Sequence, residues 1–178
     1  ILDACDHTDR LVGDLLLLSR LDAKQMTFEL EDLDATALLA DMERHARPLA
    51  ASRAVRLNVG AASGVLRADT TRLRQVLLIL IDNALRHTPA GGSVTLEARL
   101  QGSHVRLIVC DTGAGIAPEH LPRVFDRFYR ADAAHSSKGS AGLGLSIAKA
   151  LVEGMRGAIS IASAPGAGTQ VTVTLPRQ

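Results

Sequence analysis

The spacing of apolar residues predicts a helix at the start of the chain. Between residues 1 and about 24, apolar or small residues recur at alternating steps of four and three, at Ile1, Cys5, Thr8, Val12, Leu15 and Ser19. Leu11, Leu18 and Leu21 broaden this stripe, so apolar side chains occupy more than one face of the helix. Such a helix needs another helix to pack against. This favours a fragment of a helix bundle over the alternative, a core helix of the main domain.

Alternating and helical patterns predict the remaining elements. Asp34 and Asp69 each precede a run with helical periodicity, where a side-chain oxygen can accept hydrogen bonds from the first turn. They predict helices over residues 35–51 and 70–87. Alternating apolar and polar residues predict strands over 27–34, 54–60, 64–69, 93–100, 104–110, 157–163 and 168–176. A short helix over 117–125 and a longer one over 142–155 complete the set.

This order of elements predicts an α+β fold. Pairs of adjacent strands alternate with helices, which is typical of a two-layer α/β sandwich with helices on one face of a mixed sheet. The strict alternation of strand and helix found in doubly wound nucleotide-binding folds is absent from the sequence pattern. Residues 126–141 are polar and rich in serine and alanine, and they predict a long loop.

Composition excludes several classes of function. The 178 residues have a net charge of +1, which is not the basic field expected of a protein that binds nucleic acid or an anionic membrane. Aromatic residues make up 2% of the chain, so stacking platforms for single-stranded nucleic acid are missing as well. No apolar run approaches the roughly 18 residues needed to cross a bilayer, and no signal peptide is visible. Cys5 and Cys110 have no metal-ligand spacing and are expected to be reduced, buried thiols.

A strand that ends on a carboxylate and passes directly into two glycines predicts a small-molecule site. The run "VRLIVCDTGAGIAP" places Asp111 before Gly113 and Gly115. Glycine permits positive φ and close approach of a ligand to the main chain. A carboxylate at the mouth of such a turn can accept hydrogen bonds from amine or hydroxyl donors. The same pattern also occurs in ordinary turns.

Three further stretches indicate a ligand that contains phosphate. Asn83, Arg86 and His87 share one face of an apolar helix, where an amide, a guanidinium and an imidazole suit a metal ion and a polyphosphate. In "GSAGLGLSIAK", glycines precede a helix whose first N–H groups can bind phosphate. "PGAGT", at 165–169, is a tight turn. Each stretch also has a structural explanation: a satisfied helix end, a helix start in a loop, and a hairpin.

Two common nucleotide motifs do not fit these stretches. Gly139 and Gly144 have the separation found in a P-loop, but Leu145 stands where that motif requires lysine. Gly113 and Gly115 are followed by Pro118, where a dinucleotide fingerprint requires glycine. The convergent glycine and amide stretches therefore need another explanation.

In order and spacing, the motifs resemble the catalytic ATP-binding domain of bacterial two-component sensor histidine kinases. "QVLLILIDNALRHTP" resembles the family's N box, "DTGAGI" its G1 box, "FDRFYR" its F box, "GSAGLGLSIAK" its G2 box and "PGAGT" its G3 box, across roughly residues 30–176. "RLVGDLLLLSRLDA" resembles the second helix of the family's dimerisation and phosphoacceptor hairpin. The resemblance implies a hairpin remnant over 1–24, whose first helix is cut away, and a Bergerat-fold ATP-binding domain over 25–178.

The resemblance also implies roles for individual residues. Asn83 would bind Mg²⁺ that bridges the ATP phosphates, Arg86 would lie near the phosphates, and His87 would lie against the nucleotide. Asp111 would accept a hydrogen bond from the adenine amino group, and Thr169 would lie beside adenine. The other residues implied to bind ATP are Gly113, Gly115, Ile116, Tyr129, Arg130, Lys138, Gly142, Leu143, Gly144 and Leu145.

The long loop over 126–141 would form a lid over ATP, closed by Phe125 and Phe128. Arg127, Arg130 and Lys138 are candidates for phosphate contacts within it. A solvated loop without such contacts is the alternative for all three cations.

The implied reaction is transfer of the γ-phosphoryl group of ATP to a histidine, with relay to a response regulator. The domain would supply positioning and charge neutralisation, with ATP and Mg²⁺ as cofactors. The family's phosphoacceptor segment, similar to His-Glu-Leu-Arg-Thr-Pro, does not occur in this chain, and His7 has different neighbours. We therefore expect ATP binding without autophosphorylation. The resemblance further implies homodimerisation of the full-length protein through the hairpin helices and a cytoplasmic domain, with membrane contact only through segments outside this chain.

One departure from the family pattern leaves two alternatives open. Ile79 stands one helical turn before Asn83, at a position where the family usually has asparagine. This change favours, as an alternative, a catalytically impaired ATP-binding or dimerisation scaffold. A serine kinase of the anti-sigma type has the same ATP-binding fold, but the leucine-rich first helix is not typical of that class.

Overall fold

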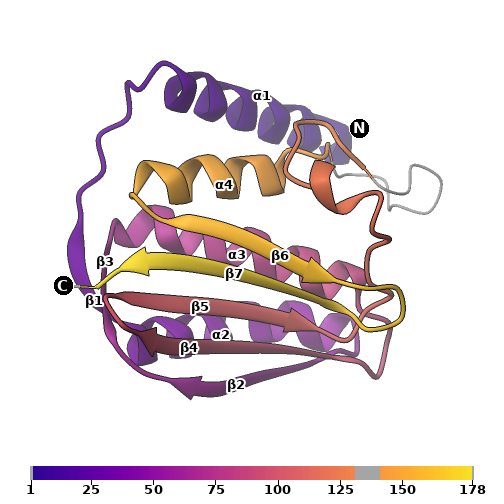
Figure 1. Cartoon of the computed structure of the whole chain (residues 1–178). Helices are drawn as coiled ribbons and strands as arrows, with labels where there is room; N and C mark the ends of the chain where they lie inside the picture. The colour runs from indigo at the N-terminus through magenta and orange to yellow at the C-terminus, as the bar shows by residue number, and fades with distance from the viewer. Residues whose placement is uncertain (1, 131–140, 178) are drawn as a thin grey trace.

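The fold has two layers, a mixed sheet and a layer of helices that covers one of its faces (Figure 1). The structure, a computed structural model, describes residues 2–130 and 141–177, with side chains from residue 11 onwards. The main sheet has the strand order β2 (Arg56–Ala62), β4 (Ser93–Gln101), β5 (His104–Asp111), β7 (Thr169–Pro176) and β6 (Ala158–Ser163). β2 and β4 are parallel, and the other neighbours are antiparallel. The predicted α+β sandwich is confirmed.

Alternate residues of the central strands explain why helices cover only one face. In β4, the side chains of Val94, Leu96 and Ala98 are fully buried, whereas Thr95 and Glu97 between them are partly exposed. Successive side chains of a strand point to opposite faces, so β4 turns one apolar face to the helices and one polar face to solvent. Three helices complete the core: α2 (Ala35–Ser52), α3 (Thr70–His87) and α4 (Gly144–Gly154).

Both predicted helix caps are present. The Asp34 carboxylate accepts a hydrogen bond from the Ala37 N–H at 2.8 Å, and α2 begins at the next residue. The Asp69 carboxylate accepts one from the Arg72 N–H at 3.0 Å, at the start of α3. Asp34 is the last residue of β1 (Glu31–Asp34) and Asp69 directly follows β3 (Val65–Ala68), and these two strands form a separate two-stranded sheet. This small sheet therefore fixes where both helices begin.

Replacing Asp69 with alanine is expected to lower the free energy of unfolding by about 1–2 kcal/mol, because the first turn of α3 would lose its side-chain acceptor. The other oxygen of Asp69 also accepts a hydrogen bond from the Glu29 N–H at 3.2 Å, which places the expected loss toward the upper end. Urea unfolding measures the change. Asp69→Asn keeps an oxygen at the cap and serves as the control; equal stability of the alanine and asparagine variants would contradict this account.

The structure corrects three predicted element boundaries. The first predicted strand, over 27–34, begins at Glu31, because Phe28 packs against α4 instead of continuing the sheet. A Cβ added at Gly154 would lie 2.3 Å from the Phe28 ring. The short helix predicted over 117–125 is confined to a 3₁₀ turn, η1 (Leu121–Arg123). The last helix begins at Gly144 rather than at residue 142, since Gly142 has a positive φ of 70°.

The N-terminal helix α1 (Leu2–Asp22) packs on α4 through one of its faces (Figure 1). Leu18 is buried at the contact and belongs to the core of the main domain. Val12, Leu15 and Leu16 are 51%, 44% and 55% exposed, so the helix has a second apolar face in contact with solvent, as the sequence predicts. None of the helices in the described ranges is long and apolar enough to cross a membrane.

The outward face of the sheet holds Cys110 as a free, half-buried thiol. Burial raises its pKa, with the nearby Glu97 carboxylate as a further cause. A raised pKa disfavours the reactive thiolate. Cys110 is less buried than the sequence predicts, and the side chain of Cys5 lies outside the described part.

Candidate functional site

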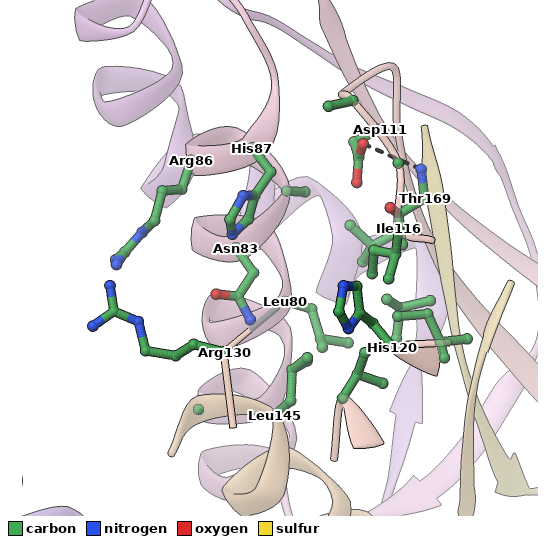
Figure 2. A pocket seen from close by; sticks show the side chains of 18 of the residues that line it. Leu80, Asn83, Arg86, His87, Asp111, Ile116, His120, Arg130, Leu145 and Thr169 are labelled. Carbon is green, nitrogen blue, oxygen red and sulfur yellow. Dashed lines mark hydrogen bonds between the residues drawn. The ribbon is translucent and has the colours of Figure 1, made fainter. Parts of the chain in front are cut away.

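A cavity of about 550 Å³ lies at the end of the sheet where β5 ends and β7 begins. Its walls come from α3, the turn after β5, residues between His120 and Arg130, and the start of α4 with Gly142 before it. Most of the residues implied to bind ATP line it: Asn83, Arg86, His87, Asp111, Gly115, Ile116, Tyr129, Arg130, Gly142, Gly144, Leu145 and Thr169. Figure 2 shows Asn83 and His87 on one side and Ile116 and Thr169 on the other.

Three of the implied residues do not line the cavity in the described structure. Gly113 contacts Asp111 instead, and its main-chain N–H donates a hydrogen bond to Oδ1 of that residue. Leu143 is a core residue, only 1% exposed, that precedes the first turn of α4. Lys138 lies outside the described residues, as does most of the predicted lid over 126–141.

The structure also places one predicted phosphate contact elsewhere. The Arg127 guanidinium makes hydrogen bonds of 2.6 and 2.8 Å to the two carboxylate oxygens of Asp22, at the end of α1. The pair lowers the pKa of Asp22 and raises that of Arg127 through this hydrogen bond. Arg127 is therefore engaged with α1 rather than with the cavity, whereas Arg130 lines the cavity.

Asp111 is held with one oxygen bonded to the main chain. Its Oδ1 accepts hydrogen bonds from the N–H groups of Gly113, at 2.8 Å, and of Thr169, at 3.2 Å. Burial is the largest influence on its pKa and raises it, while the two backbone N–H groups and His87 act in the opposite direction. Both of these hydrogen bonds go to Oδ1. Among the described residues no hydrogen bond goes to Oδ2, so this oxygen can accept one from a ligand. Figure 2 shows this carboxylate at the upper end of the cavity.

Close backbone contacts at two glycines shape the turns around Asp111. A Cβ at Gly115, where φ is 73°, would lie 1.9 Å from the carbonyl oxygen of Ala164. A Cβ at Gly168, where φ is 76°, would lie 1.9 Å from the carbonyl oxygen of Asp111 itself. The turn after β5 and the turn before β7 therefore pack backbone against backbone, which only glycine permits at these positions.

A hydroxyl cluster ties these two turns together. The Ser163 hydroxyl accepts a hydrogen bond from the Ile116 N–H at 2.8 Å and donates one to the Gly168 carbonyl at 2.7 Å. It also lies 3.0 Å from Oγ1 of Thr169. The segment from Asp111 to Ile116 is thus anchored to the end of β6, and the cavity wall it forms is held by the sheet.

Polar residues from the last turns of α3 form the opposite wall. Burial lowers the pKa of His87, and the neighbouring Arg86 guanidinium lowers it further, so the imidazole is neutral near pH 7. Arg86 makes a 2.6 Å ion pair with Asp82. The guanidinium groups of Arg86 and Arg130 lie toward each other at one end of the cavity (Figure 2). This end is therefore suited to an anion, and the Asp111 end to a hydrogen-bond donor.

Ile79 lies outside the lining. It packs at the first turn of α4, where a Cβ added at Gly144 would lie 3.2 Å from its Cγ2 atom. Ile79 therefore makes an apolar contact between α3 and α4 at this point, and Asn83 reaches the cavity one helical turn later.

Sequence reasoning missed the apolar floor and one polar residue. The floor is made by core side chains of α3 and the sheet: Leu80, Ala84, Val109, Ile161 and Val171. The helical period of α3 and the alternation of the strands predict that these residues face inward, but neither pattern indicates a ligand. The missed polar residue, His120, lies across the cavity from α3 (Figure 2). A single histidine before a short turn has no spacing pattern that would identify it.

Metal binding at this site would depend on one protein oxygen. In the described ranges, no three side chains of histidine, cysteine, aspartate or glutamate lie close enough together to hold a metal ion. Asn83 offers a neutral amide oxygen at the cavity. Mg²⁺ commonly takes one or two protein oxygens and completes its shell with water and substrate phosphates, so the residues present fit Mg²⁺ only together with a phosphate ligand.

Known proteins are similar to this chain in sequence. Residues 68–178 match the family of histidine kinase-, DNA gyrase B- and HSP90-like ATPases. The chain is 40% identical over 97% of its length to the sensor protein DivL of Caulobacter vibrioides, and 38% identical over 99% to the sensor protein SrrB of Staphylococcus aureus. It spans only 22% and 31% of those proteins.

Solved structures agree with this assignment. Full-length ShkA in complex with AMPPNP has a TM-score of 0.85 and 33% sequence identity, over 98% of this chain and 36% of that one. The histidine kinase AdeS of Acinetobacter baumannii, at 24% identity and a TM-score of 0.83, covers 99% of this chain and 82% of its own and has the same fold. The chain thus belongs to the histidine kinase-, DNA gyrase B- and HSP90-like ATPase family, as the ATP-binding catalytic core of a sensor histidine kinase.

Proposed function

We propose that the cavity binds ATP together with Mg²⁺, and that the intact protein transfers the γ-phosphoryl group to a histidine for relay to a response regulator. The observation that supports this most strongly is the carboxylate of Asp111. Its Oδ1 is held by two main-chain N–H groups, and Oδ2 remains as an acceptor for a ligand in a half-buried position. A fixed acceptor beside apolar walls suits the exocyclic amino group of adenine.

The other end of the cavity supplies the features that a triphosphate needs. Arg86 and Arg130 provide positive charge, and the N-terminus of α4 directs main-chain N–H groups toward the cavity at Gly144. Asn83 would be a protein ligand of Mg²⁺, which when bound neutralises charge on the phosphates. The neutral His87 would lie against the nucleotide without adding charge. This domain would then contribute positioning and electrostatic stabilisation to phosphoryl transfer.

Replacing Asn83 with alanine tests the metal part of the proposal. Mg²⁺ is expected to tighten binding of a non-hydrolysable ATP analogue to the parent chain, and this gain should fall roughly tenfold or more in Asn83→Ala, because one charge-assisted contact is lost. Calorimetric titration with and without Mg²⁺ measures both values. Asn58→Ala, on the exposed face of β2, is the matched control. An unchanged Mg²⁺ effect in Asn83→Ala would exclude Asn83 as the ligand.

Histidine phosphorylation, dimerisation and partners concern the whole protein. The related sensor proteins are much longer than this chain. We propose that residues 1–24 belong to a dimerisation hairpin and residues 25–178 to the catalytic domain. The exposed apolar face of α1 supports this division. The domain would act in the cytoplasm, with a response regulator as its downstream partner. The scaffold and serine-kinase alternatives have less support, since the similar proteins named above are sensor proteins and histidine kinases.

We further propose that residues 1–178 alone do not phosphorylate themselves on histidine. The chain has no segment similar to His-Glu-Leu-Arg-Thr-Pro, and the residues around His7 do not match it. Incubation with γ-labelled ATP is therefore expected to leave no acid-labile label on the chain. Stable label on His7, mapped by mass spectrometry and absent from His7→Ala, would refute this expectation.

A further inference from the structure

A histidine–tyrosine pair forms part of the cavity wall that faces α3. Nδ1 of His120 lies 2.7 Å from the hydroxyl oxygen of Tyr129, a hydrogen-bond distance, and both side chains are partly buried and line the cavity. Neither the adenine contact at Asp111 nor the phosphate end requires this pair. Its position between two differently anchored segments gives it a separate role.

His120 belongs to the segment that the sheet holds in place. The Ile116 N–H donates to the Ser163 hydroxyl at 2.8 Å, and the His120 N–H donates to the Ala117 carbonyl at 2.9 Å, immediately before η1. These bonds fix the backbone that presents the imidazole. His120 is thus attached, through a few residues, to the end of β6.

Tyr129 belongs to the other segment, which lies beside the start of α4. The Phe128 N–H donates to the Gly142 carbonyl at 2.9 Å, and a Cβ at Gly142 would lie 2.8 Å from the carbonyl oxygen of Tyr129. The guanidinium carbon of Arg123 lies 4.4 Å from the centre of the Tyr129 ring, within cation–π range. The tyrosine is therefore held on its ring by Arg123 and at its hydroxyl by His120.

From this geometry we infer that His120 is a positioning residue for nucleotide binding. Its hydrogen bond holds the Tyr129 ring in the orientation that completes the cavity wall. This inference rests on the proposed ATP site and adds a residue to it. A wall that is ordered before the ligand arrives reduces the entropy lost on binding, so removing the hydrogen bond should weaken affinity even where no ligand contact is lost. If the hydrogen bond contributed to stability alone, its loss would change thermal unfolding and leave the affinity for nucleotide unaltered.

The chain supplies its own probe for this pair. Tyr129 is the only tyrosine and there is no tryptophan, so intrinsic fluorescence reports on this residue alone. Affinity for a non-hydrolysable ATP analogue with Mg²⁺ is measured by calorimetric titration, because two of the variants lack the tyrosine. The proteins compared are the parent, His120→Ala, His120→Asn, Tyr129→Phe and the double variant His120→Ala/Tyr129→Phe. Asparagine is chosen because its amide can take the place of Nδ1. His104→Ala, at an exposed position of β5, is the matched control, and Asp111→Asn tests the nucleotide site separately.

Each single variant that breaks the pair is expected to bind the analogue about fivefold more weakly, as for loss of one net hydrogen bond. The double variant should show the same loss instead of about twenty-fivefold, because its two changes remove one interaction. His120→Asn and His104→Ala should bind as the parent does. Tyrosine emission without nucleotide should change in His120→Ala and stay unchanged in His104→Ala.

Additive losses in the double variant, or parent-like affinity in His120→Ala, would overturn the inference while leaving the ATP site in place. Should His120→Ala fail to fold, the comparison of His120→Asn with Tyr129→Phe decides: equal affinities for these two overturn the inference. A parent chain that does not bind the analogue overturns the proposed function, and the inference with it.

Discussion

Asp111→Asn is expected to weaken binding of a non-hydrolysable ATP analogue roughly a hundredfold, because a charged acceptor for the adenine amino group is replaced by a neutral amide. The asparagine oxygen can still accept the hydrogen bonds that the Gly113 and Thr169 N–H groups give to Oδ1. Its NH₂ group would then occupy the place of Oδ2 and face the ligand's own donor. The variant should therefore fold normally and lose affinity, as calorimetric titration and thermal unfolding measured together will establish.

The raised pKa of Asp111 gives this prediction a pH dependence of known sign. Burial raises the folded-state pKa above its ordinary value of 3.8, so the folded chain binds the proton more tightly than the unfolded chain does. At pH values above the raised pKa, the ionised carboxylate therefore lowers the free energy of unfolding. This loss of stability becomes smaller as the pH falls and is gone below the ordinary value of 3.8. Asp111→Asn should lack that dependence and be at least as stable as the parent at neutral pH. Affinity of the parent should fall as Asp111 is protonated.

Parent-like affinity in Asp111→Asn would show that the carboxylate does not recognise the ligand. A large drop in stability at neutral pH would contradict the view that the asparagine oxygen replaces Oδ1. The two failures are separable, because affinity and unfolding are measured on the same preparation.

Gly168→Ala is expected to destabilise the fold by about 2–5 kcal/mol. A left-handed backbone costs a residue with Cβ about 1–2 kcal/mol, and forcing extra atoms into a packed site adds about 1–3. At this position φ is 76°, and the new Cβ would lie 1.9 Å from the Asp111 carbonyl oxygen. The turn must move to relieve that contact, and the Thr169 N–H moves with it, so nucleotide affinity should also fall.

The same turn contains a matched control for this prediction. Gly166 also has a φ of 76°, but a Cβ there would meet nothing within 4 Å. Gly166→Ala should therefore lower the free energy of unfolding by only the backbone contribution, about 1–2 kcal/mol, and leave nucleotide affinity unchanged. Chemical denaturation of both variants measures the difference. Equal losses in the two variants would mean that the close backbone approach at Gly168 does not contribute.

Local signals made much of the fold predictable from the sequence. Asp34 and Asp69 cap α2 and α3 through hydrogen bonds within the first turn of each helix, so the caps could be predicted from neighbouring residues. The alternation of apolar residues likewise identified the strands of the sheet. The start of the first strand was wrong because Phe28 alternates correctly but packs on α4, a contact that no local pattern encodes.

Contacts between distant residues account for what the sequence could not predict. Arg127 matches a basic position of the family motif, yet its partner is Asp22, 105 residues earlier in the chain. His120 lines the cavity because the Ile116 N–H donates to the Ser163 hydroxyl, 47 residues later in the chain, and this bond holds the segment at the end of β6. The predicted ATP-binding residues, by contrast, were found by resemblance in motif order, and the structure brings most of them to one cavity. Their roles stay predictions.

The most direct test of the ATP site is a titration of the parent chain with a non-hydrolysable ATP analogue, with and without Mg²⁺. We expect binding in the micromolar range that requires Mg²⁺, despite Ile79 in place of the family's asparagine. No detectable binding in the presence of Mg²⁺ would contradict the proposed function and favour the scaffold alternative. Ile79→Asn would then be the first variant to examine.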